Sequence, residues 1–159
     1  MTRQRLREVV GRMNTEVCDQ CGKCPSACPV TARIEDFNPR QIIAKVDLGR
    51  EEDLMNSGVI WTCTSCLKCR ERCPEEISPY DVILELRREA IAEGKPHPAS
   101  YEEAEKAVTE TGVVQQPQPA RTRGRDRKDR AALGLPPAQK PKDQAKYTQA
   151  IKELKEAEK

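Results

Sequence analysis

Aromatic and apolar residues are scarce in this sequence. Of its 159 residues, 3% are aromatic and 36% are hydrophobic, whereas 34% are charged. Such a chain can bury only a small core, and small domains with weak cores are usually stabilised by a metal or by disulfides. The composition therefore predicts a compact part that depends on more than its own packing.

Targeting and membrane-spanning signals are missing as well. Residues 1–13 are rich in arginine and lack the apolar stretch of a signal peptide. No segment approaches the ~18 consecutive apolar residues of a membrane span. We therefore expect a cytoplasmic protein without a membrane span. In that compartment structural disulfides are rare, so clustered cysteines indicate metal binding.

Signals for nucleotide and nucleic-acid binding are absent or weak. There is no G-x-G-x-x-G and no P-loop, so no flavin, nicotinamide or nucleotide site of a known kind is predicted. The net charge is only +2. One basic run lacks interleaved aromatics and consists of Arg121, Arg123, Arg125, Arg127, Lys128 and Arg130. We expect this run to contact an acidic partner surface rather than nucleic acid.

Cysteine, by contrast, is abundant. The first four cysteines have the spacing C-x2-C-x2-C-x3-C, and a second group repeats it 45 residues later. The two groups are Cys18, Cys21, Cys24 and Cys28, and Cys63, Cys66, Cys69 and Cys73. A proline follows each group, Pro29 and Pro74. This pattern is the bacterial-type [4Fe–4S] ligand motif.

The fourth cysteine of each motif has a special role in two-cluster ferredoxins, where it binds the cluster of the other motif. We therefore expect one cluster on Cys18, Cys21, Cys24 and Cys73, and another on Cys63, Cys66, Cys69 and Cys28. The exchange would couple cluster assembly to folding. Two zinc ions or four disulfides are the alternatives, but zinc sites generally use pairs of C-x2-C. Because two fully ligated clusters use every thiol, the pattern indicates an electron carrier without a catalytic residue of its own.

Around the cysteine loops the sequence predicts helices. Leu6, Val9, Val10 and Met13 follow helical spacing. Asn38-Pro39 and Ser78-Pro79 each open a helix, which Gly49 and Gly94 end. No period-two run predicts a strand. We therefore expect an all-α cluster-binding domain over residues 1–95, with Trp61 packed over the second cluster.

Residues 96–159 predict an extended, partner-docking tail with short helices. Ser100 and Glu103 form a capping-box pattern, and Tyr147, Ile151 and Leu154 mark a helix near the C-terminus. The segment between them is rich in proline and basic residues, and we expect it to be irregular. Beside the cysteine loops, positive side chains would offset the charge of anionic clusters; they are Lys23, Arg33, Lys68, Arg70 and Arg72.

A family resemblance rests on four segments: CDQCGKCPSACP from Cys18, the helix opened by Asn38-Pro39, WTCTSCLKCRERCP from Trp61, and ISPYDVI from Ile77. Together they resemble the C subunit of heterodisulfide reductase over roughly residues 17–94. The resemblance implies an α-helical ferredoxin domain with two [4Fe–4S] clusters, acting as an electron-transfer subunit of an oxidoreductase.

The partners follow from the same resemblance. In methanogenic archaea, the C subunit relays electrons between a flavin-containing A subunit and a catalytic B subunit. The catalytic partner reduces the coenzyme M–coenzyme B heterodisulfide at clusters held by Cys-Cys-Gly motifs, and a hydrogenase or formate dehydrogenase is the upstream donor. This sequence has no Cys-Cys dipeptide, so the resemblance places disulfide reduction on a partner chain.

Other assignments stay open at this point. The same helical module occurs in iron–sulfur subunits of glycolate and glycerol-3-phosphate dehydrogenases, and a sulfur-oxidation version of heterodisulfide reductase exists. From a different class, a zinc-binding interaction module would also use many cysteines. Iron content separates the zinc module from the others.

Overall fold

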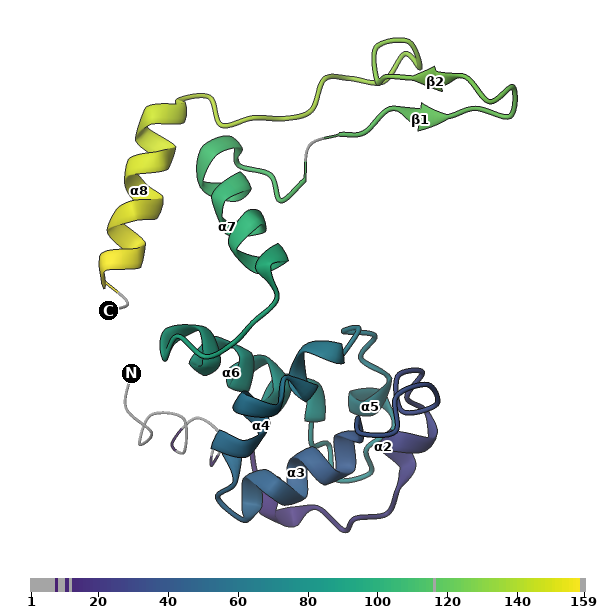
Figure 1. Cartoon of the computed structure of the whole chain (residues 1–159), viewed down its shortest axis with the longest axis vertical. Helices are drawn as coiled ribbons and strands as arrows, with labels where there is room; N and C mark the ends of the chain where they lie inside the picture. The colour runs from purple at the N-terminus through teal and green to yellow at the C-terminus, as the bar shows by residue number, and fades with distance from the viewer. Residues whose placement is uncertain (1–7, 9–10, 12, 116, 158–159) are drawn as a thin grey trace. The chain divides into compact units, whose positions relative to one another are not determined.

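The computed structural model describes residues 8, 11, 13–115 and 117–157 (Figure 1). The chain divides into two compact units, Met1–His97 and Pro98–Lys159. Its described residues are mostly helical and include one small two-stranded sheet, which lies in the second unit. The predicted helix through Leu6, Val9 and Val10 lies outside the described residues, although Met13 packs against the core.

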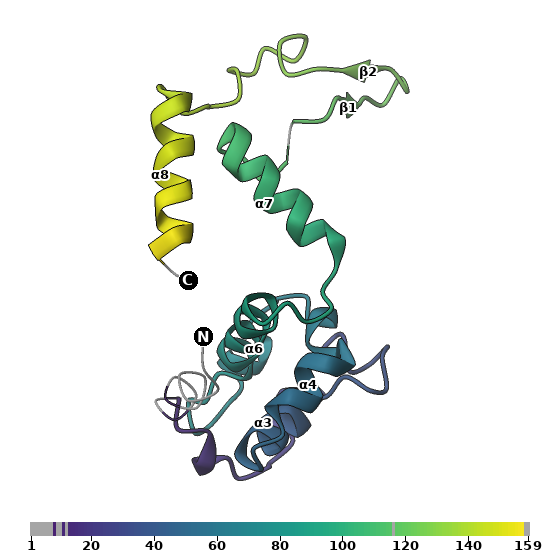
Figure 2. The ribbon, with the colours of Figure 1, turned by 60° about the vertical axis from the view of Figure 1, so that its left-hand side comes forward.

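The first unit contains only helices and loops among its described residues. They are η1 (Thr15–Val17), α2 (Lys23–Ser26), α3 (Pro39–Asp47), α4 (Glu51–Ser57), η2 (Val59–Thr62), α5 (Lys68–Glu71) and α6 (Pro79–Ala92). Helices α3, α4 and α6 pack against one another (Figure 2), and the short helices α2 and α5 lie side by side (Figure 1). Each short helix belongs to one cysteine motif, so this packing brings the two motifs together.

The two longer helices of this unit, α3 and α6, begin in the way that the sequence predicts. Asn38 Oδ1 accepts hydrogen bonds of 3.0 and 3.4 Å from two first-turn amides of α3. Ser78 Oγ accepts one of 3.3 Å from a first-turn amide of α6. Both helices start with proline, and left-handed glycines follow their ends, Gly49 with φ 70° and Gly94 with φ 66°. The predicted starts and ends of both helices are confirmed.

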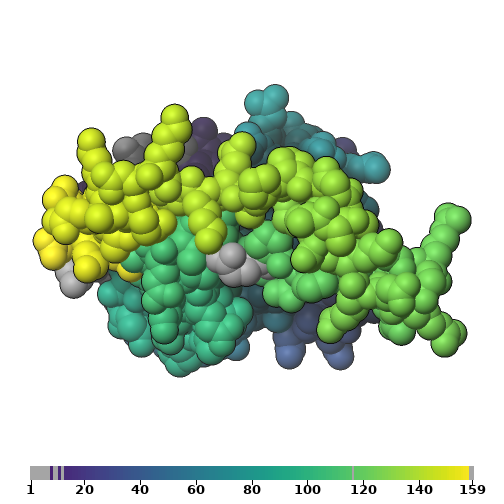
Figure 3. Space-filling model, turned by 90° about the horizontal axis from the view of Figure 1, so that it is seen from above, coloured from purple at the N-terminus to yellow at the C-terminus, as the bar shows by residue number. Residues whose placement is uncertain are grey.

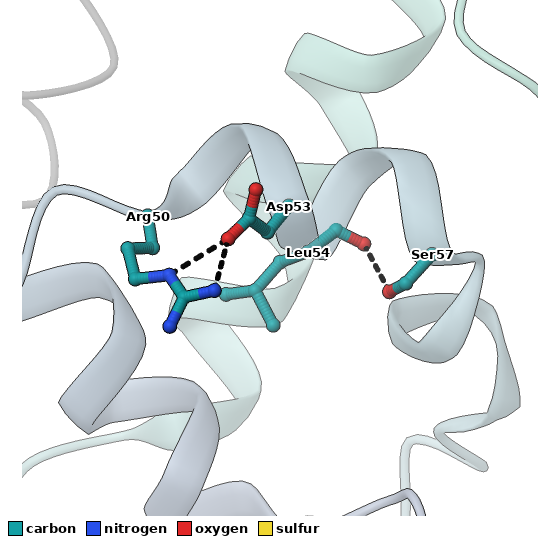
Figure 4. A network of polar contacts seen from close by, with 4 residues as sticks. All are labelled: Arg50, Asp53, Leu54 and Ser57. Atoms are coloured by element: carbon teal, nitrogen blue, oxygen red, sulfur yellow. Dashed lines mark hydrogen bonds and ion pairs between the residues drawn. The ribbon is translucent and has the colours of Figure 1, made fainter.

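Helix α4 was not predicted from the sequence, because only two of its residues, Leu54 and Met55, carry an apolar side chain into the core. Polar contacts lie at both of its ends (Figure 4). Arg50 donates to Asp53 Oδ2 through Nε and Nη2, each at 2.7 Å, and Ser57 Oγ donates to the Leu54 carbonyl at 3.0 Å. Exposed pairs of this kind add little stability, so burial of the two apolar side chains holds α4 in place.

The core of the first unit is small and lies between α3, α4 and α6. Its buried apolar residues are Val30, Phe37, Ile42, Ile43, Val46, Leu54, Met55, Ile60, Ile77, Val82, Ile83, Leu86 and Ala90. The first and fourth cysteines of both motifs pack against this core; they are Cys18, Cys28, Cys63 and Cys73. The core therefore fixes both ends of each cysteine loop.

The second unit consists of α7 (Ala99–Thr111), strands β1 (Ala120–Arg121) and β2 (Arg127–Lys128), and α8 (Gln144–Ala157). Helices α7 and α8 lie side by side (Figure 2). Tyr147 Oη donates to the Val108 carbonyl at 3.0 Å, and Thr148 Oγ1 donates to the Thr109 carbonyl at 3.1 Å. None of the described residues of α7 or α8 is buried. This helix pair therefore has no core of its own.

Two predictions for this unit were wrong. Helix α7 begins at Ala99 after Pro98 and has no side-chain cap, so Ser100 already lies inside the helix and cannot act as its N-cap. The basic segment is not wholly irregular, since Arg121 pairs with Arg127 in the antiparallel hairpin β1–β2. Figure 3 draws the residues of this hairpin in green. Strands of two residues each are too short to show the alternation of apolar and polar residues from which a strand is predicted.

Replacing Gly112 with alanine should destabilise the second unit. Gly112 has φ +77°, and an added Cβ would lie 2.8 Å from the ring of Pro141. Gly134 is a matched control, with φ +67° and no atom within 4 Å of an added Cβ. Both alanines carry the strain of a left-handed residue, so the difference between the variants measures the clash, which we expect to exceed ~1 kcal/mol. Urea unfolding of the full chain tests this; equal losses in the two variants would contradict the contact.

Candidate metal centre

The first cavity joins three cysteines of one motif to the fourth cysteine of the other. Its walls include the thiol-bearing residues Cys18, Cys21, Cys24 and Cys73. It encloses about 390 Å³ of space, part of which is open to solvent. Cys73 reaches it because α5, which precedes that cysteine, packs beside α2.

The second cavity has the reciprocal composition. Its thiol-bearing wall residues are Cys28, Cys63, Cys66 and Cys69. It encloses about 330 Å³, again partly open to solvent. All eight cysteines are free thiols, and each lines one of these two cavities. The grouping is the exchanged one that the sequence predicts for two clusters.

Equivalent residues of the two halves line the cavities, which reveals an internal repeat. Besides its thiols, the first cavity is walled by Arg40 and Ile43 of α3 with Ile77 and Pro79 from the segment after Cys73. The second is walled by Tyr80 and Ile83 of α6 with Phe37 and Pro39 from the segment after Cys28. The first half thus supplies a three-cysteine loop and the start of α3 to the first site, and a cysteine, an apolar residue and a proline to the second site. The second half does the same with the two sites exchanged, and its helix is α6.

The two cysteine loops have left-handed residues at the same two positions. Gln20 and Gly22 have φ values of 52° and 80°, and their equivalents Ser65 and Leu67 have 56° and 61°. Left-handed residues in a tight loop turn backbone N–H groups toward a common concavity, which suits an anionic group. In the first loop, Gln20 Nε2 also donates to Cys18 Sγ at 3.3 Å.

Two of the thiols, those of Cys24 and Cys69, favour the protonated form in the protein without metal. Burial, with the charge of nearby Cys18, raises the pKa of the Cys24 thiol from 9.0 to about 12. Burial also raises the pKa of the Cys69 thiol. Because thiolate is the ligand form, loading iron into these sites must release protons.

The donor sets suit a cluster of several irons better than a single ion. A mononuclear zinc site needs four sulfurs about 2.3 Å from one centre. Among the described residues, no three His, Cys, Asp or Glu side chains converge closely enough to hold one ion. The four thiols of each site instead surround a cavity, which fits a cubane whose corners each take one thiolate.

A buried arginine, which was not predicted from the sequence, binds the backbone where the second cysteine loop begins. Arg87 is 6% exposed, and it donates from Nε and Nη2 to the Ile60 carbonyl at 2.9 and 2.7 Å. Nη2 also donates to the carbonyl of Cys63 at 2.8 Å. The sequence did contain a signal for this buried arginine: Arg87 lies four residues after Ile83, on the apolar face of α6. A charged side chain on that face needs a buried partner.

Trp61 does not line the second cavity, so the prediction that it packs over the second cluster was wrong. It belongs to η2, which packs on α6, and the Arg87 guanidinium carbon lies 5.5 Å from the centre of its ring. The ring of His97 lies 6.1 Å from that of Trp61. Trp61 therefore covers Arg87 and the core rather than the cysteine loop.

Replacing Arg87 with methionine should lower the free energy of unfolding by about 2–4 kcal/mol, because the Ile60 and Cys63 carbonyls would lose their buried donors. Arg88 is the control: its side chain is 55% exposed and pairs with Glu85 at 3.1 Å, so Arg88→Met should cost less than about 0.5 kcal/mol. Urea unfolding of the iron-loaded chain gives both values. Similar losses in the two variants would contradict this role for Arg87.

Comparison with known proteins gives the family. Residues 17–78 match the model of a 4Fe-4S dicluster domain. The chain is 36% identical over 138 residues to the C subunit of the ferredoxin:CoB-CoM heterodisulfide reductase of Methanosarcina mazei, covering 87% of this chain and 80% of that one. No helix in the described ranges is long and apolar enough to cross a membrane.

Two further relatives match over shorter stretches. The C subunit of the H(2):CoB-CoM heterodisulfide,ferredoxin reductase of Methanothermobacter thermautotrophicus is 36% identical over 92 residues, 58% of this chain and 49% of that protein. The C subunit of a ferredoxin:CoB-CoM heterodisulfide reductase of Methanosarcina acetivorans is 44% identical over 77 residues, 48% of this chain and 30% of that protein. The chain thus spans half or less of these two relatives. With the 4Fe-4S domain and the near full-length match to the Methanosarcina mazei protein, this chain belongs to the family of heterodisulfide reductase C subunits.

Proposed function

We propose that this chain is the electron-transfer subunit of a cytoplasmic heterodisulfide reductase complex. In this proposal it relays electrons one at a time through two [4Fe–4S] clusters, from the flavin-containing A subunit to the catalytic B subunit, which reduces the coenzyme M–coenzyme B heterodisulfide. A hydrogenase or formate dehydrogenase would supply the electrons. The chain itself would carry no catalytic residue.

The observation that carries the proposal is the division of all eight cysteines between two four-thiol cavities. We assign the first cluster to Cys18, Cys21, Cys24 and Cys73, and the second to Cys28, Cys63, Cys66 and Cys69. When bound, a [4Fe–4S] cluster takes up and releases one electron at a time. With every thiol engaged, no cysteine is left for nucleophilic or disulfide-exchange chemistry, which favours a relay over catalysis.

The remaining side chains of the two sites set the environment of the clusters. Arg40, which donates from Nη1 to the Gln20 carbonyl at 3.2 Å, and Lys23 line the first cavity. The same cavity is also lined by two acids, Asp19 and Glu75, so the basic and acidic side chains around a cluster there would balance in charge. At the second site, Phe37 and Ile83 exclude water from the inner wall. Arg87 holds the carbonyl of Cys63 and so fixes the start of the second loop.

The partners are proposed from the relatives, whose names describe components of enzymes that act on the CoB–CoM heterodisulfide with ferredoxin or H2. Purification of the native complex through a tag on this chain, followed by identification of its other subunits, tests the assignment. The complex should contain a flavoprotein and a Cys-Cys-Gly protein, and reduced flavoprotein should bleach the clusters of this chain. A complex with a glycolate or glycerol-3-phosphate dehydrogenase would contradict it.

A further inference from the structure

The internal repeat allows the mouths of the two sites to be compared residue by residue. Gly22 and Leu67 each follow the second cysteine of their motif and open a four-residue helix, α2 or α5. Both have left-handed backbones, with φ 80° and 61°. The same turn is therefore made by glycine at the first site and by leucine at the second.

Leucine is an unfavourable residue for this turn. A left-handed backbone costs a residue with a Cβ roughly 1–2 kcal/mol, whereas glycine adopts it freely. The first loop shows that glycine is sufficient to form the turn. A strained residue that the fold does not require is a reason to look for a function. Leu67 lines the second cavity and is still 39% exposed.

The residues after Leu67 also differ from their equivalents. The second loop continues with Lys68, Arg70 and Arg72, all exposed, where the first has Lys23, Pro25 and Ala27. Arg70 makes one long ion pair of 3.8 Å with Asp81, and its side chain is 61% exposed. Three basic residues and the single acid Glu71 give the segment 68–72, which directly follows Leu67, a net charge of +2.

An exposed apolar side chain next to polar and charged residues matches the general composition of protein interfaces, an apolar centre with a polar rim. Leu67 is also adjacent to Cys66, one of the two exposed cysteines. A protein bound over Leu67 would therefore lie against the outermost ligand of the second site. At the first site Gly22 offers no such anchor, and the charged residues lining that cavity are of both signs: Asp19, Lys23, Arg40 and Glu75.

We propose that Cys66, Leu67, Lys68, Arg70 and Arg72 form a docking surface, the Leu67 face, for another protein of the complex. The partner surface that fits it is an apolar pocket with an acidic rim, close to that protein's own redox centre. Electrons then pass between the chains at Cys66. This inference rests on the proposed function, because it locates the contact with one partner of the relay.

The test compares two leucines of equal exposure. Leu67 and Leu84 are each 39% exposed, so Leu67→Ala and Leu84→Ala remove similar apolar surface. The iron-loaded variants are added to the purified native complex from which this chain has been stripped, and their dissociation constants are measured. Leu67→Ala should weaken binding roughly tenfold, and Leu84→Ala less than about threefold. Lys68→Glu with Arg72→Glu should slow association and reduce its dependence on salt.

Iron content and EPR spectra are recorded for every variant, so that cluster loss is separated from lost docking. Wild-type affinity in Leu67→Ala with intact clusters would overturn the proposal. Self-association of the wild-type chain in sedimentation, abolished by Leu67→Ala, would also overturn it, because the face would then bind a second copy. A wild-type chain without iron clusters would contradict the proposed function instead.

Discussion

Replacing Cys28 with alanine should damage the cluster of the second motif, although Cys28 belongs to the first motif. The thiol of Cys28 lines the cavity formed by Cys63, Cys66 and Cys69. A [4Fe–4S] cluster that loses one of four protein ligands is lost or converted to a smaller form, so iron should fall from about eight per chain toward about four. The first cluster keeps all its ligands and should remain.

Four variants make this test independent of how the spectra are assigned. Cys66→Ala removes a ligand that any scheme gives to the second cluster, and Cys21→Ala does the same for the first. In EPR spectra of the reduced proteins, Cys28→Ala should lose the same component as Cys66→Ala. Cys73→Ala should lose the same component as Cys21→Ala. If Cys28→Ala instead matches Cys21→Ala, each motif holds its own cluster and the exchanged assignment is wrong.

Removing the iron should unfold most of the first unit. Its core is small, and the loops that carry the cysteines contribute few buried side chains to it. Without clusters, two partly open cavities would remain between the motifs, and the thiols of Cys24 and Cys69 would take up protons. Structural zinc ions supply about 10–16 kcal/mol in small domains, and two clusters that cross-link the motifs should supply at least about 5 kcal/mol.

For a unit of about 100 residues, a loss of that size corresponds to a Tm lowered by roughly 20–40 °C. Far-UV circular dichroism of chelator-treated and iron-loaded protein measures this change. The Cys28→Ala variant, which keeps one cluster, should melt between the two. A metal-free protein with the Tm of the loaded one would contradict a structural role for the clusters.

The sequence was most informative where a local rule decides the structure. The starts of α3 and α6 follow from Asn38-Pro39 and Ser78-Pro79, because a side-chain oxygen and a first-turn proline act within one turn of helix. The cysteine spacing predicts two clusters with an exchanged fourth ligand. The cysteines line two cavities in this grouping, and the ligand assignment itself stays a prediction. Family membership was predicted from the same segments.

What the sequence did not reveal depends on contacts between distant segments. Helix α4 is short and polar, and packing on α3 and α6 stabilises it rather than its own pattern. The position of Arg87 on the apolar face of α6 indicates a buried partner, but the sequence does not show that the partners are the carbonyls of Ile60 and Cys63. The strain at Leu67 became visible only when its φ could be compared with that of Gly22. In each case the structure depends on residues that are distant in the sequence or on a backbone angle that the sequence does not show.

The central claim, that this chain carries two [4Fe–4S] clusters for electron transfer, is tested most directly by metal analysis of anaerobically purified protein. Two clusters of four irons each require about eight irons and about eight acid-labile sulfides per chain, with Mössbauer spectra of [4Fe–4S] centres that dithionite reduces. A colourless protein with two zinc ions and no labile sulfide would contradict the claim.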